Sequence, residues 1–218
     1  MDVESVDYYA ACDNAIKSMD RLNLEMFGRL KMSNWDRINV IRTVVAVYER
    51  SAKEARKRYY EVAFESYLLM MALCDIPHKK AHQMAEKAIT ENWVDNILKQ
   101  TDFVTLYRFN SETERKAYRL AETLEVSTDR DMEINKALRA WVQQLAQYAI
   151  NMTDYAMLQA MEDAGIREAE WVSVADERRC HECSSLDGRM FRIDEFPSKP
   201  HMRCRCRMRP VKEKKEEE

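Results

Sequence analysis

Four of the six cysteines in this 218-residue chain lie within 27 residues near its C-terminal end, together with a histidine. They form a C-x2-C pair and, 17 residues later, an H-x2-C-x-C group, which comprise Cys180, Cys183, His201, Cys204 and Cys206. Two cysteines one turn apart can direct both sulfurs at one ion, and the second group supplies the remaining corners of a tetrahedron. The spacing therefore predicts a structural Zn2+ site held by four of these five residues.

The identity of the fourth ligand stays open between two residues. Cys180, Cys183 and Cys204 are the three primary candidates, and either His201 or Cys206 completes the set. The H-x2-C spacing favours His201, whereas Cys206 shares a face with Cys204 if this segment is extended. A small β module contains little apolar core, so we expect the metal to supply the missing folding energy.

Arginines alternate with the second cysteine group, at Arg203, Arg205, Arg207 and Arg209. In an extended chain, alternation places all four on the face opposite the cysteines. Segment 176–212 contains ten Lys and Arg against six Asp and Glu, a local net charge of +4 in a chain whose net charge is −3. The row predicts contact with nucleic-acid phosphate or an acidic partner, and the alternative is a solvated face.

Composition indicates a mainly helical protein and gives no support for catalysis. Charged residues make up 33% and hydrophobic residues 46%, with only three glycines and four prolines. Three glycines cannot build a phosphate-binding loop, and no nucleophile lies near a matching base. We therefore expect no enzymatic activity.

The acidic start and the short apolar runs predict neither a signal peptide nor a membrane span. The cysteines are therefore expected to be metal ligands and not to form disulfides.

Apolar residues at helical spacing predict five helices, over 4–30, 35–74, 78–99, 111–126 and 131–163. Pro77 ends the second of these and begins the third, and Gly165 ends the last. The helix over 35–74 contains no Gly or Pro and would span about 60 Å at 1.5 Å per residue. That length exceeds a compact domain of this size, so we expect the helix to extend from the body or to pack in an oligomer.

After Gly165 the pattern changes to short strands, predicted over 171–174, 190–191 and 203–211. The fold class is therefore mainly α, with a long-helix body followed by a small zinc-stapled β (α+β) module. The predicted organisation is an N-terminal helix (1–34), a helical body (35–165), a zinc-binding β module (166–211) and a disordered charged tail (212–218).

Residues 165–211 resemble the C-terminal signature of the phage head-morphogenesis family, the minor head proteins of tailed phages that include Mu-type phages and prophages. The matching residues are Gly165, Trp171-Val172-Ser173, Asp176, Cys180-x-x-Cys183, Leu186-Asp187-Gly188, Phe191, Pro200-His201 and Cys204-Arg205-Cys206. Two departures stand out. Met202 replaces the proline that usually follows the histidine, and Asn151-Met152-Thr153-Asp154 stands where the family often has Ala-Arg-Thr-Glu, so the arginine is absent.

The resemblance implies a minor head protein that acts in head morphogenesis and in DNA packaging or ejection. Its implied partners are the portal protein and the major capsid or scaffold protein, and it would be oligomeric in the virion. Its implied location is inside the head near the portal, after assembly in the host cytoplasm. Non-specific DNA contact would fall to the arginines. The alternative is a zinc-dependent nucleic-acid-binding protein that acts as a regulator.

Overall fold

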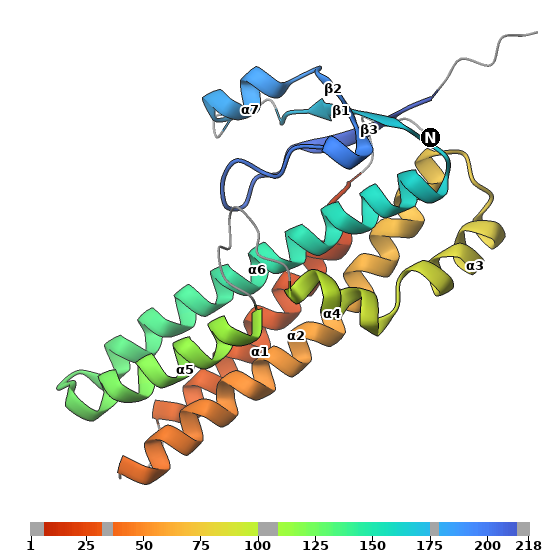
Figure 1. The fold of residues 1–218 in the computed structure, drawn as a ribbon. Coiled ribbons are helices and arrows are strands. Elements are labelled where there is room, and N and C mark those ends of the chain that lie inside the picture. Colours follow the sequence, from red (N-terminus) through yellow and green to blue (C-terminus); the bar gives the residue numbers. More distant parts are fainter. Residues whose placement is uncertain (1–6, 32–36, 100–108, 175–178, 213–218) are drawn as a thin grey trace, which may run out of the picture.

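The computed structural model describes residues 7–31, 37–99, 109–174 and 179–212, and it confirms the predicted fold class: a helical body carries a small antiparallel sheet formed by the C-terminal part of the chain (Figure 1). The elements are α1 (Ala10–Lys31), α2 (Arg37–Leu73), α3 (His78–Ala88), α4 (Glu91–Lys99), α5 (Phe109–Val126), α6 (Arg130–Asp163), β1 (Glu168–Val172), α7 (His181–Leu186), β2 (Met190–Arg192), the 3-10 turn η2 (Ile193–Glu195) and β3 (Arg207–Val211). The start of the first predicted helix, Asp176 of the signature, and positions 213–218 of the predicted tail lie outside the described residues.

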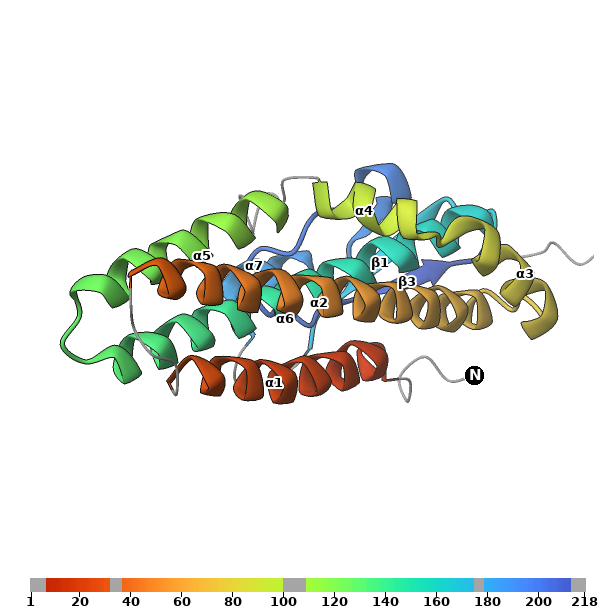
Figure 2. The ribbon, with the colours of Figure 1, turned by 90° about the horizontal axis from the view of Figure 1, so that it is seen from below.

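Helices α1, α2, α5 and α6 pack side by side along their lengths, and α3 and α4 continue the bundle at one end (Figures 1 and 2). Two tyrosine hydroxyls of α2 reach across to α6. Tyr59 donates to the Leu145 carbonyl at 3.0 Å, and Tyr67 donates to the Asp163 carboxylate at 2.6 Å. These hydrogen bonds fix how the two longest helices lie against each other.

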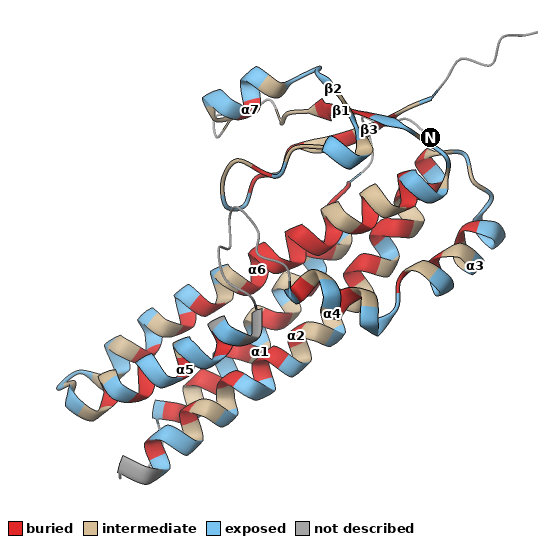
Figure 3. Ribbon diagram, in the orientation of Figure 1, coloured by how far each residue is buried: buried red, intermediate tan, exposed pale blue. Residues whose placement is uncertain are grey.

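The apolar stripe of α2 is covered within the chain. Its buried residues run nearly from end to end, at Val40, Val44, Tyr48, Ala52, Ala55, Tyr59, Val62, Ala63, Tyr67, Met70, Met71 and Leu73 (Figure 3). The expectation that this helix extends from the body or needs another chain to cover it is wrong, because α1, α5 and α6 lie along it. Oligomeric assembly stays a prediction, and it now rests on the family resemblance alone.

The single helix predicted over 78–99 is in fact two helices. Ile89 is extended and fully buried, and it separates α3 from α4. Thr90 caps the start of α4, where its hydroxyl accepts a hydrogen bond from the Trp93 amide at 3.1 Å. A threonine fits the polar face of an amphipathic helix as well as it fits a cap, so the apolar spacing did not reveal the break.

A chain of buried polar side chains joins three helices at the centre of the bundle. The Trp141 indole donates to the Ser51 hydroxyl at 2.7 Å, and that hydroxyl donates to the Asn23 side chain at 2.5 Å. Asn23 in turn donates to the Met19 carbonyl at 2.8 Å. Every one of these polar groups has a hydrogen-bond partner inside the low-dielectric core. This series of hydrogen bonds therefore favours one rotation of α1, α2 and α6 about their own axes.

The sheet has the order β2-β1-β3, with both pairs antiparallel, and it lies across the C-terminal half of α6 (Figure 1). Gly165 ends α6 as predicted, with φ of 79°. Ala169 and Met208 from neighbouring strands join the core of the bundle, whereas Trp171 belongs to a separate small core together with three cysteines. No helix among the described residues is long and apolar enough to cross a membrane.

The three strands differ in extent from their predictions. β1 begins at Glu168, three residues before the predicted start, and β3 begins only at Arg207. Arg203 adopts φ of 58°, which belongs to a turn and not to a strand. The alternation of burial nevertheless continues through this segment, with Cys204, Cys206 and Met208 buried.

Candidate metal centre

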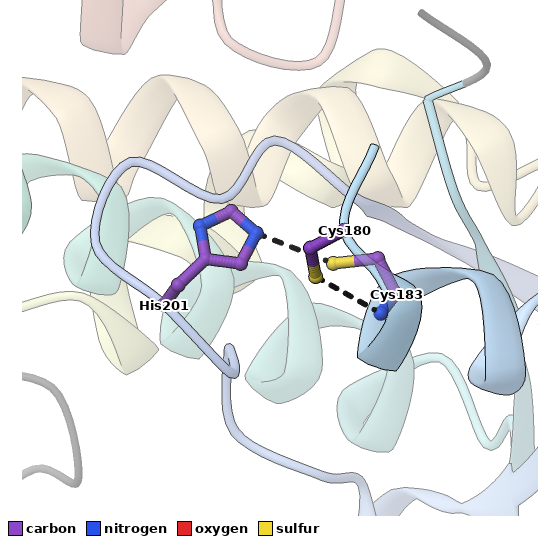
Figure 4. Close-up of side chains that lie close together, drawn as sticks. All are labelled: Cys180, Cys183 and His201. Carbon is purple, nitrogen blue, oxygen red and sulfur yellow. Dashed lines mark hydrogen bonds between the residues drawn. The ribbon is translucent and has the colours of Figure 1, made fainter. Parts of the chain in front are cut away.

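The first turn of α7 positions the C-x2-C pair. Cys180 is the N-cap of this helix, and its sulfur accepts a hydrogen bond from the Cys183 amide at 3.2 Å. A side chain that caps a helix in this way lies beside the residue three positions later, so the two sulfurs face the same side (Figure 4). Cys183 is buried and Cys180 is half-buried.

Helix α6 positions the second cysteine group. The turn at Arg203 presents its amide to the Gln147 side chain, which accepts a hydrogen bond at 2.8 Å. Gln147 is fully buried and also donates to Asn151 at 2.9 Å. Two polar residues in the middle of α6 thus hold the backbone from which His201 and Cys204 project.

The structure brings all five predicted residues together. They form two groups that share Cys183: one with Cys180 and His201, the other with Cys204 and Cys206, and within each group the ligand atoms lie within 4.8 Å of one another. The Cys183 sulfur lies 3.4 Å from His201 Nε2 and 3.5 Å from the Cys204 sulfur. Ligands about 2.3 Å from a tetrahedral zinc ion lie about 3.7 Å apart, so the spacing and the donor set fit a metal ion.

The histidine presents the correct nitrogen to the cluster. His201 Nδ1 lies 3.0 Å from the Met202 carbonyl, which can only accept a hydrogen bond. With Nδ1 as the donor to this carbonyl, Nε2 is the ring nitrogen that faces Cys183 and would bind a metal (Figure 4). Met202, which departs from the usual family proline, supplies this carbonyl.

The thiols of the cluster differ in acidity. A hydrogen bond from Cys204 lowers the pKa of Cys206 to about 5, and the same contact raises the pKa of Cys204. Burial raises the pKa of Cys183 to about 12. Cysteines bind a metal as thiolates, so thiols with a raised pKa lose their protons when a cation binds. His201 and Cys206 both stay candidates for the fourth ligand.

The four arginines of the predicted row differ in their surroundings. Arg205 pairs with Asp13 of α1 at 2.9 Å, and Arg209 pairs with Glu170 of β1 at 2.9 Å. The Arg207 guanidinium lies 5.4 Å from the centre of the Tyr8 ring, and Arg203 is exposed. Three of the four thus contact partners within the chain. Contact of the row with DNA or with another protein stays a prediction.

A pocket of about 260 Å3 opens beside the cysteines. Its lining contains Cys183, His201, Cys204 and Cys206, together with Arg179, Arg203, Arg205, Arg207 and the pair Tyr8 and Tyr9. The candidate metal centre thus has an arginine-lined side, where residues that precede α1 complete the wall.

Sequence reasoning missed the residues that join the cluster to the bundle. Lys199 is buried, and its ammonium contacts the Tyr9 hydroxyl at 3.0 Å and the Asp154 carboxylate at 3.4 Å. Tyr9 and Lys199 are 190 positions apart, so no local pattern links them. Two features of the sequence could have pointed to them, and both are weak. Lys199 lies two positions before the candidate ligand His201, and Asp154 is the acid that the α6 segment shares with the family motif.

Residues 116–209 match the protein family described as Phage Mu protein F like protein. The matched segment extends from α5 into β3 and contains all five cluster residues. It confirms the resemblance that the C-terminal signature predicted, and it points to a phage head-morphogenesis protein. No curated protein and no solved structure shows a significant match to the chain.

Proposed function

We propose that this protein is a minor head protein of a tailed bacteriophage or prophage, which acts beside the portal inside the head during morphogenesis and DNA packaging or ejection. The observation that supports this most is the family match over 116–209, which covers both the later bundle helices and the cysteine module. The proposed role is structural, and the proposed location is the virion. The major capsid or scaffold protein is a further proposed partner.

We propose that the cluster holds a structural Zn2+ ion. The candidate ligands are Cys180, Cys183, Cys204 and either His201 or Cys206. When bound, the ion supplies strong bonds between segments that otherwise share only a small core. These residues then hold α7 against the loop that precedes β3, which gives the sheet one rigid edge.

Assembly with the portal is tested by co-expression. We expect this protein to co-purify with the portal protein of the same phage or prophage, and to be incorporated into heads in few copies per portal. The measurement is affinity capture through a tagged portal followed by mass spectrometry, with the major capsid protein alone as the comparison bait. Absence from both portal complexes and purified heads would contradict the proposal.

The alternative function, zinc-dependent nucleic-acid binding, predicts a strong effect of salt on DNA affinity. Arg203→Ser with Arg207→Ser removes two charges of the row that form no ion pair within the described part of the chain, whereas Arg192→Ser is a control because Arg192 is exposed and pairs with Asp194. If the row binds duplex phosphate, the log–log salt slope of the double variant falls by about 0.9 per phosphate contact that the substitutions remove. Equal slopes for the double variant, the control and the unmodified protein would show that the row does not bind DNA.

A further inference from the structure

A buried group of polar side chains lies behind the metal centre and comes from three distant parts of the chain. Tyr9 immediately precedes α1, Asp154 lies on α6, and Lys199 lies in the loop before the second cysteine group. The side chains of Lys199 and Asp154 are only 5% and 14% exposed, and Tyr9 is 4% exposed. Burial of an ion pair carries a large desolvation cost, which further hydrogen bonds must offset.

Those further hydrogen bonds reach the backbone of a metal-ligand candidate. The Tyr9 hydroxyl lies 3.0 Å from the Cys206 carbonyl and 3.1 Å from Asp154, and its oxygen accepts a hydrogen bond from Lys199. The Lys199 ammonium also donates to the same Cys206 carbonyl. The Lys199 ammonium and the Tyr9 hydroxyl, from opposite ends of the sequence, thus both lie within hydrogen-bond distance of one carbonyl oxygen, and Asp154 contacts both groups.

Two aromatic rings lie near the Lys199 ammonium. Lys199 Nζ lies 5.7 Å from the centre of the Tyr9 ring and 5.3 Å from the centre of the Trp171 ring. Arg205, which lies between the two buried cysteines, covers the Tyr9 ring at 5.4 Å and pairs with Asp13 one turn further along α1. The start of α1 is therefore held by Lys199 and by Arg205, which directly precedes Cys206.

We infer that Tyr9, Asp154 and Lys199 are positioning residues for the metal centre. They hold the Cys206 backbone so that the thiolates of the 204–206 segment face Cys183, and they make the affinity for metal depend on the residues at the start of α1. Groups that orient metal ligands from outside the coordination sphere typically change affinity 10- to 100-fold when they are removed. This inference rests on the proposed zinc site, and it adds a contribution from a region that the family match does not cover.

The test compares Tyr9→Phe with Tyr118→Phe in the full chain. Tyr9→Phe removes the hydroxyl and keeps the ring, and Tyr118 is an exposed tyrosine of α5. Zinc affinity is measured by competition with a chromophoric chelator, and the ligand field by the absorption of the Co2+-substituted protein. We expect about tenfold weaker zinc binding and a shifted cobalt spectrum for Tyr9→Phe, and no change for Tyr118→Phe.

The reciprocal effect gives a second measurement. Because coupling between two sites is mutual, chelation of the metal should speed hydrogen exchange at residues 7–15 of the unmodified protein and leave the centre of α2 unchanged. Lys199→Arg should retain more zinc affinity than Lys199→Met, since it keeps a cationic donor. Equal affinities and cobalt spectra for both tyrosine variants would overturn the inference. An unmodified protein that binds no zinc would contradict the zinc site itself, which direct metal analysis shows separately.

Discussion

Cys183→Ser is expected to abolish zinc binding and to unfold the segment 166–211, while the bundle stays helical. Cys183 is the residue that both ligand groups share, and it is 1% exposed. Structural zinc contributes about 10–16 kcal/mol of apparent binding free energy in small zinc-binding modules, which is folding free energy there. Among the described residues, the second core holds only Trp171 and three cysteines as buried residues, so apolar burial cannot replace that contribution.

The matched control for this prediction is Cys74→Ser. Cys74 is half-buried at the end of α2 and does not belong to either ligand group. Metal analysis should give about one zinc per chain for the unmodified protein and the control, and close to none for Cys183→Ser. Hydrogen exchange should then show weaker protection in β1 and β3 of the cluster variant and retained protection in α2 and α6. One zinc per chain in Cys183→Ser, with a protected sheet, would contradict a zinc-dependent module.

Acidification offers an independent route to the same state. Every cysteine ligand binds as a thiolate, so protons compete with the metal as the pH falls. We therefore expect zinc release and loss of protection in the sheet to coincide on titration toward acid. The centre of α2 lies away from the candidate ligands, and its protection should persist through that step, whereas exchange at residues 7–15 should rise with zinc release.

Sequence patterns predicted most of the helical body because its elements are long and strongly periodic. The centre of α2 and the whole of α6 follow from apolar spacing, and Gly165 marks the end of α6 through a left-handed φ that glycine favours. Boundaries that depend on one side chain were missed. Thr90 caps α4 through a single hydrogen bond, and the same residue type fits an uninterrupted helix equally well.

Two polar residues of α1 show why tertiary contacts were harder to predict. Asp13 and Asn23 interrupt the apolar pattern of the helix, and local reasoning gives neither one a role. In the structure Asn23 bonds to Ser51, and Asp13 pairs with Arg205, which is 192 positions away. The meeting of the cysteines at one site was predictable, because four thiols and an imidazole at this spacing are a typical donor set for zinc. The buried residues Tyr9, Asp154 and Lys199 were not predictable, because buried hydrogen bonds impose no fixed spacing on the sequence.

Trp171→Ala is expected to destabilise the sheet module by about 3–5 kcal/mol, the usual loss for removal of a buried large aromatic side chain. Trp171 is fully buried, and its ring stacks on Phe196 at a centroid distance of 5.6 Å. It also packs against the buried cysteines, so its removal takes away most of the apolar part of the second core. Zinc affinity should fall together with stability, because folding of the module and metal binding are coupled.

The control for this substitution is Trp93→Ala, which removes a half-buried indole of α4 that packs against the bundle core and not against the cysteine core. Hydrogen exchange at 168–172 and 207–211 should rise in Trp171→Ala alone, and excess zinc should restore part of that protection because the ion binds the folded module. Ala169 and Met208 nevertheless join the sheet to the core of the bundle. If the C-terminal turns of α6 lose protection to the same degree as β1, the module and the bundle unfold as one unit, and zinc then stabilises the whole chain and not the module alone.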